Sequence, residues 1–247
     1  MNRIDPKADA LFLDLDGTLL DIQMTPNDVF APEGLVPTLA DLVGSFDGAV
    51  AVITGRRVAD ADTLLAPLQL ITAGVHGAEM RLSPRGIVVA MAPPFPSDLL
   101  RDVLSFVRPL DGIDVEEKGA AIAVHYRKAP SQRVLIERKL SDALRGRGHN
   151  LELSHGRMVL EIKSMTCSKG EALAYLARQP DFIGRRPIMI GDDAPDVDAL
   201  AMAQRLGGLG LKVAGEYFTR SSSDFAGPAE VREWLKDLAT SHGRRLR

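Results

Sequence analysis

The 247-residue chain has very little cysteine, no excess of positive charge and no long hydrophobic run. Its one cysteine, Cys167, excludes an internal disulfide and a cysteine-based metal cluster, and is typical of a reducing compartment. The formal net charge of −3 argues against general nucleic-acid binding, which depends on a basic face. No apolar stretch is long enough for a bilayer, and residues 1–7 lead into a run too short for a signal peptide. We therefore expect a cytoplasmic protein with neither a nucleic-acid nor a membrane partner.

One stretch near the N-terminus combines an apolar run with two carboxylates. Residues 10–13 are all apolar and lead directly into Asp14 and Asp16, which Gly17 and Thr18 follow. A short unbroken apolar run predicts a strand buried on both faces, and open α/β sheets bind ligands at the carboxyl ends of such strands. Two neighbouring carboxylates repel each other and lose solvation there, so a divalent cation would compensate them.

Two other interpretations of this stretch are a solvated turn and a calcium loop. Asp and Gly are ordinary turn residues, so the strand could simply end in an exposed turn. A calcium loop starting at Asp14 would need glycine at its sixth position and an acid at its twelfth, where the chain has Leu19 and Thr25. The stretch alone therefore leaves a metal site and a turn as alternatives.

Strands and helices alternate along most of the chain. Further apolar runs of strand length occupy residues 49–53, 70–73, 187–190 and 208–213. Helical spacing or helix-start signals mark residues 32–46, a stretch ending near 65, the segment starting at 168, and residues 196–206 and 228–238. This alternation predicts an α/β domain with a parallel sheet.

A different pattern interrupts this domain after the proline-rich segment at residues 93–96. It consists of one helix, two strands, a second helix and two more strands, at residues 97–107, 113–117, 120–126, 131–144, 151–153 and 158–163. Such an order predicts a compact α+β module. We therefore expect residues 1–90 and 164–247 to form one domain and residues 91–163 to form a second domain inserted into it.

Four of the expected strands end in side chains that can bind metal or phosphate: Asp14 and Asp16, Thr54, His76 and Glu79, and Asp192, Asp193 and Asp196. Because parallel strands end at one edge of the sheet, these groups can converge. Lys169 lies at a helix start, where backbone N–H groups favour anions. Carboxylates, a hydroxyl and a lysine are the groups that metal-assisted phosphoryl transfer needs.

These residues resemble the four motifs of the haloacid dehalogenase (HAD) superfamily. Asp14-Leu15-Asp16-Gly17-Thr18 is similar to motif I, Thr54 to motif II, Lys169 to motif III and Gly191-Asp192-Asp193-x-x-Asp196 to motif IV. The order of the motifs and the position of the inserted module also agree. The resemblance implies a Rossmann-like core with a C2B-type cap domain between motifs II and III.

The resemblance also implies a role for each motif residue. Asp14 would attack phosphorus to give an aspartyl-phosphate, and Asp16 would act as general acid and then general base. Mg²⁺ would be held by Asp14, the backbone carbonyl of Asp16 and Asp192. Asp193 or Asp196 would support the metal from behind, and Thr54 and Lys169 would hold the phosphoryl oxygens.

The inserted module carries charged pairs that share strand faces. Alternation puts Glu161 beside Lys163 on one face and Glu116 beside Lys118 on another. From spacing alone, such pairs could bind sugar hydroxyls or could form ordinary ion pairs on a solvated sheet face.

A second resemblance, to trehalose-6-phosphate phosphatases, addresses these pairs. It rests on Gly74-Val75-His76-Gly77-Ala78-Glu79, on Glu116-x-Lys118 with His125-Tyr126-Arg127, and on Glu161-Ile162-Lys163 with Ser168-Lys169-Gly170. It implies that Glu116, Lys118, Arg127 and Glu161 bind glucosyl hydroxyls, with His125 and Lys163 as neighbours. His76, Gly77 and Glu79 would lie in the cleft beneath the cap; for His76, a purely structural role is the alternative.

The resemblance implies a Mg²⁺-dependent hydrolase that converts trehalose 6-phosphate to trehalose and phosphate. Other sugar phosphates, such as those of sucrose or glucosylglycerol, are the alternative substrates. A sugar-phosphate-binding sensor without catalysis is the alternative from a different class, although the intact set of Asp14, Asp16, Lys169 and Asp192 argues against it. We expect a small-molecule sugar phosphate as the partner and a monomer or weak homo-oligomer.

Overall fold

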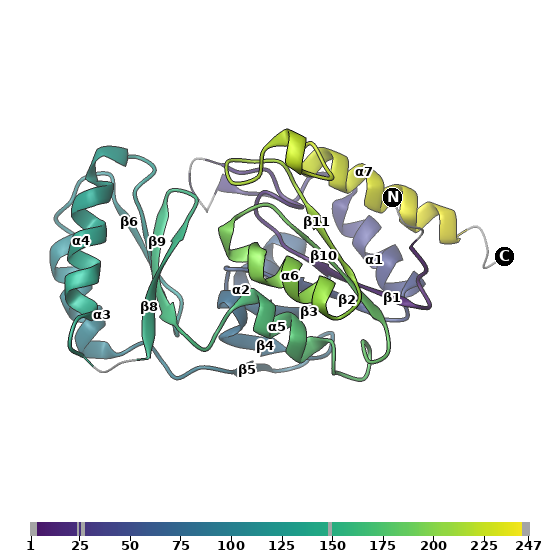
Figure 1. Ribbon diagram of the computed structural model, residues 1–247, viewed down its shortest axis with the longest axis horizontal. Helices are drawn as coiled ribbons and strands as arrows, with labels where there is room; N and C mark the ends of the chain where they lie inside the picture. The colour runs from purple at the N-terminus through teal and green to yellow at the C-terminus, as the bar shows by residue number, and fades with distance from the viewer. Residues whose placement is uncertain (1–3, 24, 26–27, 148–149, 244–247) are drawn as a thin grey trace.

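The computed structural model describes residues 4–23, 25, 28–147 and 150–243. Two β-sheets, each with its own helices, form two bodies side by side in Figure 1. Each body has its own cluster of buried apolar side chains. Among the described residues, every helix is too short or too polar to cross a membrane.

The larger sheet has seven strands in the order β11-β10-β1-β2-β3-β4-β5. Five of them are parallel: β1 (Asp9–Leu13), β2 (Val50–Ile53), β3 (Ile71–Gly74), β10 (Arg186–Gly191) and β11 (Leu209–Lys212). All residues of β1 are buried, as its unbroken apolar run predicts. The expected α/β fold with a parallel sheet is therefore confirmed, and β1 lies at its centre.

Helices cover both faces of this sheet. One face carries α1 (Leu35–Ser45) and α2 (Val58–Leu65), and α7 (Pro228–Gly243) packs against α1 there. The opposite face is covered by α5 (Lys169–Leu176) and α6 (Val197–Arg205), which pack against each other (Figure 1). The sheet and its helices thus form three layers, and these helices do not cover the carboxyl ends of the parallel strands.

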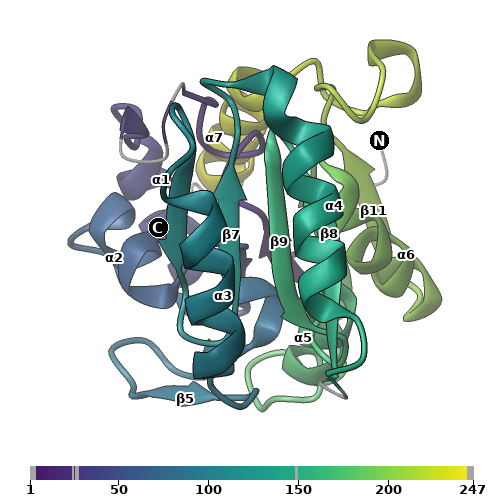
Figure 2. The same cartoon turned by 90° about the vertical axis from the view of Figure 1, so that its left-hand side faces the viewer.

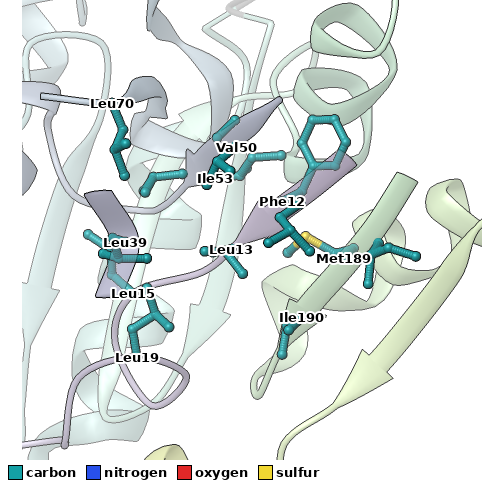
Figure 3. Packing of buried hydrophobic residues seen from close by; sticks show 14 of the residues in the cluster. Phe12, Leu13, Leu15, Leu19, Leu39, Val50, Ile53, Leu70, Met189 and Ile190 are labelled. Atoms are coloured by element: carbon teal, nitrogen blue, oxygen red, sulfur yellow. The ribbon is translucent and has the colours of Figure 1, made fainter. Parts of the chain in front are cut away.

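The core of this body lies around β1. Figure 3 shows Phe12 and Leu13 between Leu39 of α1 and the side chains Met189 and Ile190 of β10. All five side chains have an exposed fraction of 0%. Burial of each such side chain contributes roughly 1.5–3 kcal/mol, so β1 is held firmly where it delivers the residues that follow it.

The smaller sheet is antiparallel, with the order β6-β7-β9-β8. Its strands are β6 (Asp114–Glu117), β7 (Ile122–His125), β8 (Leu151–Gly156) and β9 (Val159–Ser164). Figure 2 shows α3 (Ser97–Val107) and α4 (Arg133–Leu144) side by side across one face. Leu160 and Ile162 of β9 pack in the cluster beneath these helices, so the alternate residues Glu161 and Lys163 lie on the face toward the larger sheet.

The expected alternation of strands and helices missed one hairpin. β4 (Glu79–Arg81) and β5 (Val88–Ala90) add two antiparallel strands to the edge of the larger sheet. Each strand has only three residues, which is too short for a period of two to be recognised in the sequence. Between β3 and β4 the chain makes a short 3₁₀ turn, η2 (Val75–Gly77).

Candidate active site

The first site residues follow directly from the end of β1. Asp14 is buried, and its backbone N–H donates to the Ile190 carbonyl at 3.1 Å. Gly17 has φ of 84°, and an added Cβ there would lie 2.1 Å from Asp192 Oδ2. Glycine is therefore required, because the turn after β1 passes directly against the acid that ends β10. Thr18 donates its hydroxyl to Asp192 Oδ1 at 3.2 Å.

Three buried carboxylates gather at this edge of the sheet. One oxygen from each of Asp14, Asp192 and Asp196 lies within 4.8 Å of the others. Burial, and then the charge of Asp196, hold the pKa of Asp14 well above its usual value. The same two causes raise the pKa of Asp192 to about 7. Hard oxygen ligands with this unfavourable charge density fit a divalent cation such as Mg²⁺.

Lys169 neutralises part of this charge. Its Nζ donates to Asp14 Oδ1 and to Asp196 Oδ1, both at 2.6 Å. Burial lowers the pKa of Lys169, but attraction by Asp14 and Asp196 outweighs burial and raises it above its usual value. The lysine comes first in α5, and Ser168 caps that helix by accepting the Glu171 N–H. The helix start thus fixes a charged amine against the nucleophile candidate.

Asp196 and Asp193 have different surroundings, although the sequence offered both as metal support. Asp196 Oδ2 accepts the backbone N–H groups of Asp192 and Asp193, each at 3.1 Å. Asp193 Oδ1 accepts the Ala194 N–H at 2.8 Å, and its Oδ2 accepts the Arg157 N–H at 3.1 Å. Asp196 therefore braces the carboxylate cluster, whereas Asp193 reaches the turn between β8 and β9.

Asp16 is paired with a residue that the sequence analysis did not select. Arg56 donates from Nε and from Nη2 to the two carboxylate oxygens of Asp16, both at 2.6 Å. Thr54 Oγ1 accepts the Arg56 N–H at 3.1 Å, so the segment after β2 turns back toward the site. The sequence could have indicated Arg56, because it lies only two residues after Thr54 and the loops that follow parallel strands carry binding groups.

The inserted module contributes a second set of charges to the site. Glu161 Oε2 lies 2.8 Å from His76 Nε2, and its Oε1 lies 3.2 Å from Lys118 Nζ. Lys118 Nζ also donates to the Gly55 carbonyl at 2.9 Å. Burial raises the pKa of Glu161, but Lys118 and His76 outweigh burial and lower it strongly. Glu161 is therefore an ionised carboxylate inside the interface.

A neighbouring pair lies closer to solvent. Glu116 Oε2 lies 3.1 Å from His125 Nε2 and 3.8 Å from Lys118 Nζ. Burial raises the pKa of Glu116, but His125 and Lys118 outweigh it and lower the pKa overall. The module thus presents alternating acids and bases, which is a pattern suited to hydrogen bonds with hydroxyl groups.

Both sets of residues line one cavity of about 190 Å³ between the two sheets. Among its lining residues are thirteen positions selected from the sequence: Asp14, Asp16, Thr54, His76, Glu116, Lys118, His125, Arg127, Glu161, Lys169, Asp192, Asp193 and Asp196. Arg56 and Arg157 line it as well. One cavity therefore joins the carboxylate cluster to the charged pairs of the inserted module.

Three other selected residues have different partners and are not among the lining residues of this cavity. Glu79 Oε1 accepts the Val58 N–H at the start of α2. Lys163 Nζ donates to Glu152 Oε1 at 2.6 Å and to the Cys167 carbonyl at 3.1 Å. Gly77 has φ of 97° and lies where an added Cβ would be 3.0 Å from Ala172 Cβ. Their contacts connect elements of the fold.

Comparisons with known proteins show the family of this chain. The family model for trehalose-phosphatase matches residues 12–237. A probable trehalose-phosphate phosphatase of Sinorhizobium fredii is 40% identical over 205 residues, which cover 83% of this chain and 77% of that protein. The trehalose-6-phosphate phosphatase of Escherichia coli is 35% identical over 233 residues, covering 94% and 87%.

A solved structure extends the agreement to the fold. The crystal structure of a trehalose-6-phosphate phosphatase related protein superposes with a TM-score of 0.76 and 26% identity, covering 96% of this chain and 100% of that one. The fold is the one found in phosphatases of the HAD superfamily. The family model matches the whole smaller sheet, the larger sheet except the first residues of β1, and every residue of the carboxylate cluster. The chain therefore belongs to the trehalose-phosphatase family of the HAD superfamily.

Proposed function

We propose that this protein is a Mg²⁺-dependent phosphatase that hydrolyses trehalose 6-phosphate to trehalose and phosphate. One observation carries the proposal: a single cavity has a carboxylate cluster with Lys169 at one end and the charged pairs of the inserted module at the other. The first end suits a phosphoryl group with a cation, and the second suits a glycosyl group. The names of the Escherichia coli and Sinorhizobium fredii relatives point to the same substrate.

We assign residues 1–90 and 164–247 to the catalytic core and residues 91–163 to a cap that determines the substrate. Two separate apolar clusters support this division, because each sheet buries its own side chains. The cavity lies between the two parts, so the cap can select the leaving group without altering the phosphoryl chemistry.

Mg²⁺ would be held by carboxylates of Asp14 and Asp192 and by the backbone carbonyl of Asp16. When bound, it would neutralise charge on the phosphoryl oxygens. Asp196 holds this arrangement together, because it accepts two backbone N–H groups from the loop of Asp192 and binds Lys169. Thr54 and Lys169 would donate to the phosphoryl oxygens, and both line the cavity.

The hydrolysis proceeds in two displacements. Lys169 restrains Oδ1 of Asp14, so we assign the attack on phosphorus to Oδ2. A bond forms between Asp14 Oδ2 and phosphorus, and the bond between phosphorus and the sugar oxygen breaks. Asp16 donates its proton to the sugar oxygen as it leaves. In the second displacement Asp16 takes a proton from water, whose oxygen attacks phosphorus and releases phosphate and the free Asp14 carboxylate.

The cap would recognise the sugar through Glu116, Lys118, Arg127 and Glu161. All four line the cavity, and they comprise two acids and two bases. A carboxylate accepts from a hydroxyl and a lysine or arginine donates to one, so such a set discriminates the positions of hydroxyl groups.

The test is phosphate release from a panel of phosphate esters, with Mg²⁺ and with EDTA. The panel contains the 6-phosphates of trehalose, sucrose and glucose, glucosylglycerol phosphate and an aryl phosphate. We expect trehalose 6-phosphate to have the highest kcat/KM, and we expect EDTA or Asp14→Asn to abolish release. Preference for another ester would overturn the substrate, and tight binding without release would indicate a sensor.

A further inference from the structure

The most unusual backbone of the described chain lies in η2, directly after β3. Val75, His76 and Gly77 have φ values of 48°, 55° and 97° in succession. Left-handed backbone is unfavourable for residues other than glycine, and more so for a β-branched valine. Two hydrogen bonds to the segment after β2 hold the turn: Val75 N–H donates to Arg56 O at 2.8 Å and His76 N–H to Thr54 O at 3.0 Å. Such strain persists where the surroundings impose it, and it often marks a functional position.

The turn delivers one side chain into the interface between core and cap. The His76 ring is buried, and its Nε2 lies 2.8 Å from Glu161 Oε2 on β9. Gly55 makes room for it, because an added Cβ at that position would lie 2.8 Å from His76 Cε1. The strained turn and Gly55 therefore both serve to place this imidazole opposite Glu161.

The contact determines which oxygen of Glu161 remains available. A carboxylate can only accept, so His76 donates from Nε2 to Oε2. Oε1 is buried and ion-paired with the Lys118 ammonium at 3.2 Å, and no hydrogen bond of good geometry from the described residues reaches it. A carboxylate oxygen has two lone pairs, so Oε1 can keep this ion pair and also accept a hydrogen bond from a hydroxyl in the cavity that Glu161 lines.

We propose that His76 is a positioning residue for sugar binding, which acts through Glu161. It fixes Oε2 of that carboxylate and so directs Oε1 toward a hydroxyl of the glycosyl group. The proposal rests on the proposed function, because it concerns the sugar end of the same cavity. It assigns His76 no contact with the phosphoryl group and no proton transfer.

Two substitutions distinguish this role from a structural role in the turn. The amide nitrogen of Gln extends about as far as His Nε2, whereas that of Asn reaches only as far as Nδ1. Asn, however, tolerates left-handed backbone better than Gln does. A positioning role therefore predicts that His76→Gln retains function and His76→Asn loses it, while a structural role predicts the opposite order.

The measurement is KM and kcat for trehalose 6-phosphate and for an aryl phosphate. We expect His76→Asn to raise KM for trehalose 6-phosphate about tenfold or more, and to change kcat for the aryl phosphate much less. His76→Gln is expected to stay within a few-fold of the original protein. Equal KM values for both variants, or a larger loss for Gln, would overturn the proposal.

A matched control is available within the cap. His155 Nε2 lies 2.9 Å from Glu137 Oε1, which is a similar contact on the exposed side of the cap. His155→Asn and His155→Gln are expected to leave both kinetic constants unchanged. An equal effect of the two histidines would show a general loss of stability and would contradict the proposal.

Hydrogen exchange keeps this inference separate from the identity of the substrate. In the substrate-free protein, we expect faster amide exchange in β9 around Glu161 for His76→Asn and unchanged exchange for His76→Gln. If the original protein did not hydrolyse trehalose 6-phosphate in the panel of esters, the proposed function would be overturned. Faster exchange in His76→Asn than in His76→Gln would still support the positioning of Glu161 by His76. Equal exchange in both variants would overturn that role.

Discussion

The carboxylate cluster shows how single residues make the site dependent on a cation. Asp14, Asp192 and Asp196 are buried within 4.8 Å of one another, and Lys169 supplies only one positive charge. Ionised carboxylates at that spacing are unfavourable in a buried site. The residues that would hold Mg²⁺ therefore also reduce the stability of the protein when the cation is removed.

This leads to a pH dependence that can be measured without substrate. The pKa of Asp192 rises from 3.8 to about 7, so its protonated form stabilises the metal-free protein below pH 4. That stabilisation is lost as the pH rises through about 7 and amounts to a few kcal/mol. The pKa of Glu161 is lowered from 4.5, so this carboxylate is ionised in the folded and the unfolded protein between pH 5 and pH 8. Glu161 therefore adds no pH dependence to the stability in that range.

We therefore expect the thermal midpoint of the EDTA-treated protein to fall between pH 5 and pH 8. Asp192→Asn should flatten much of this fall, and added Mg²⁺ should raise the midpoint of the original protein most at pH 8. The measurement is a series of unfolding curves by circular dichroism. Parallel pH curves for the two proteins would contradict the prediction.

Arg56 is a second residue whose role can be isolated. It holds both oxygens of Asp16, the general acid and base of the proposed reaction, at 2.6 Å. Bidentate pairing orients a carboxylate more strictly than a single lysine contact can. Arg56→Lys is therefore expected to lower kcat by about tenfold to a hundredfold, with a smaller change in KM.

The neighbouring Arg57 provides the control. It pairs with Asp60 through two hydrogen bonds of 2.8 Å on the surface of the protein. Arg57→Lys should change kcat by less than twofold, because exposed pairs contribute little. Equal losses in both variants would show that the orientation of Asp16 is not what Arg56 contributes.

At the scale of elements, Asp193 connects the loop after β10 to the turn between β8 and β9. Its Oδ2 accepts the Arg157 N–H, and the Arg157 side chain pairs with Glu216 at 2.9 Å. We expect Asp193→Ala to raise KM for the sugar phosphate several-fold, while the Mg²⁺ concentration for half-maximal activity changes little. Mg²⁺ titrations at saturating substrate measure the second quantity.

Asp196→Asn is the comparison for this prediction. Asp196 contacts Lys169 and two backbone N–H groups of the metal loop, so its loss should raise the Mg²⁺ requirement. If Asp193→Ala raised the Mg²⁺ requirement as much as Asp196→Asn did, Asp193 would support metal binding, and the prediction would be wrong.

Elements with long apolar runs could be predicted from the sequence, and contacts between elements could not. β1 and β10 each contain a short apolar run that leads into acids, so their burial and the gathering of Asp14 and Asp192 followed from the pattern. The pairing of Glu161 with His76 depends on how the cap folds over the core, and no local pattern contains that. The η2 turn could not be predicted from the sequence either, because valine disfavours the left-handed backbone that Val75 adopts.

At the scale of the whole molecule, the two sheets are in contact around the cavity. Glu161 with His76, Lys118 with Gly55 and Arg157 with Asp193 each join the cap to the core. These contacts hold the cap against the core, and we expect them to break when a sugar phosphate enters the cavity. Closure around ligand is a common way to exclude water from such a reaction.

We expect the radius of gyration from X-ray scattering to decrease when Mg²⁺ and a metal-fluoride mimic of the phosphoryl group are added with trehalose. Glu161→Ala should reduce the change, because it removes the contact of Glu161 with His76, which joins the cap to the core. An unchanged radius in the original protein would contradict closure as part of the cycle.

The central position of β1 has a consequence for how the chain folds during synthesis. β1 pairs with β10, and the Arg186 side chain meets Asp9 at a separation of 177 residues. The cap sheet, in contrast, is formed by one continuous stretch from β6 to β9. Pairing across a long separation is slow because loop closure must come first. The cap can therefore fold on the ribosome before β10 has been synthesised, so β1, which precedes the cap in the chain, completes its pairing after the cap has formed.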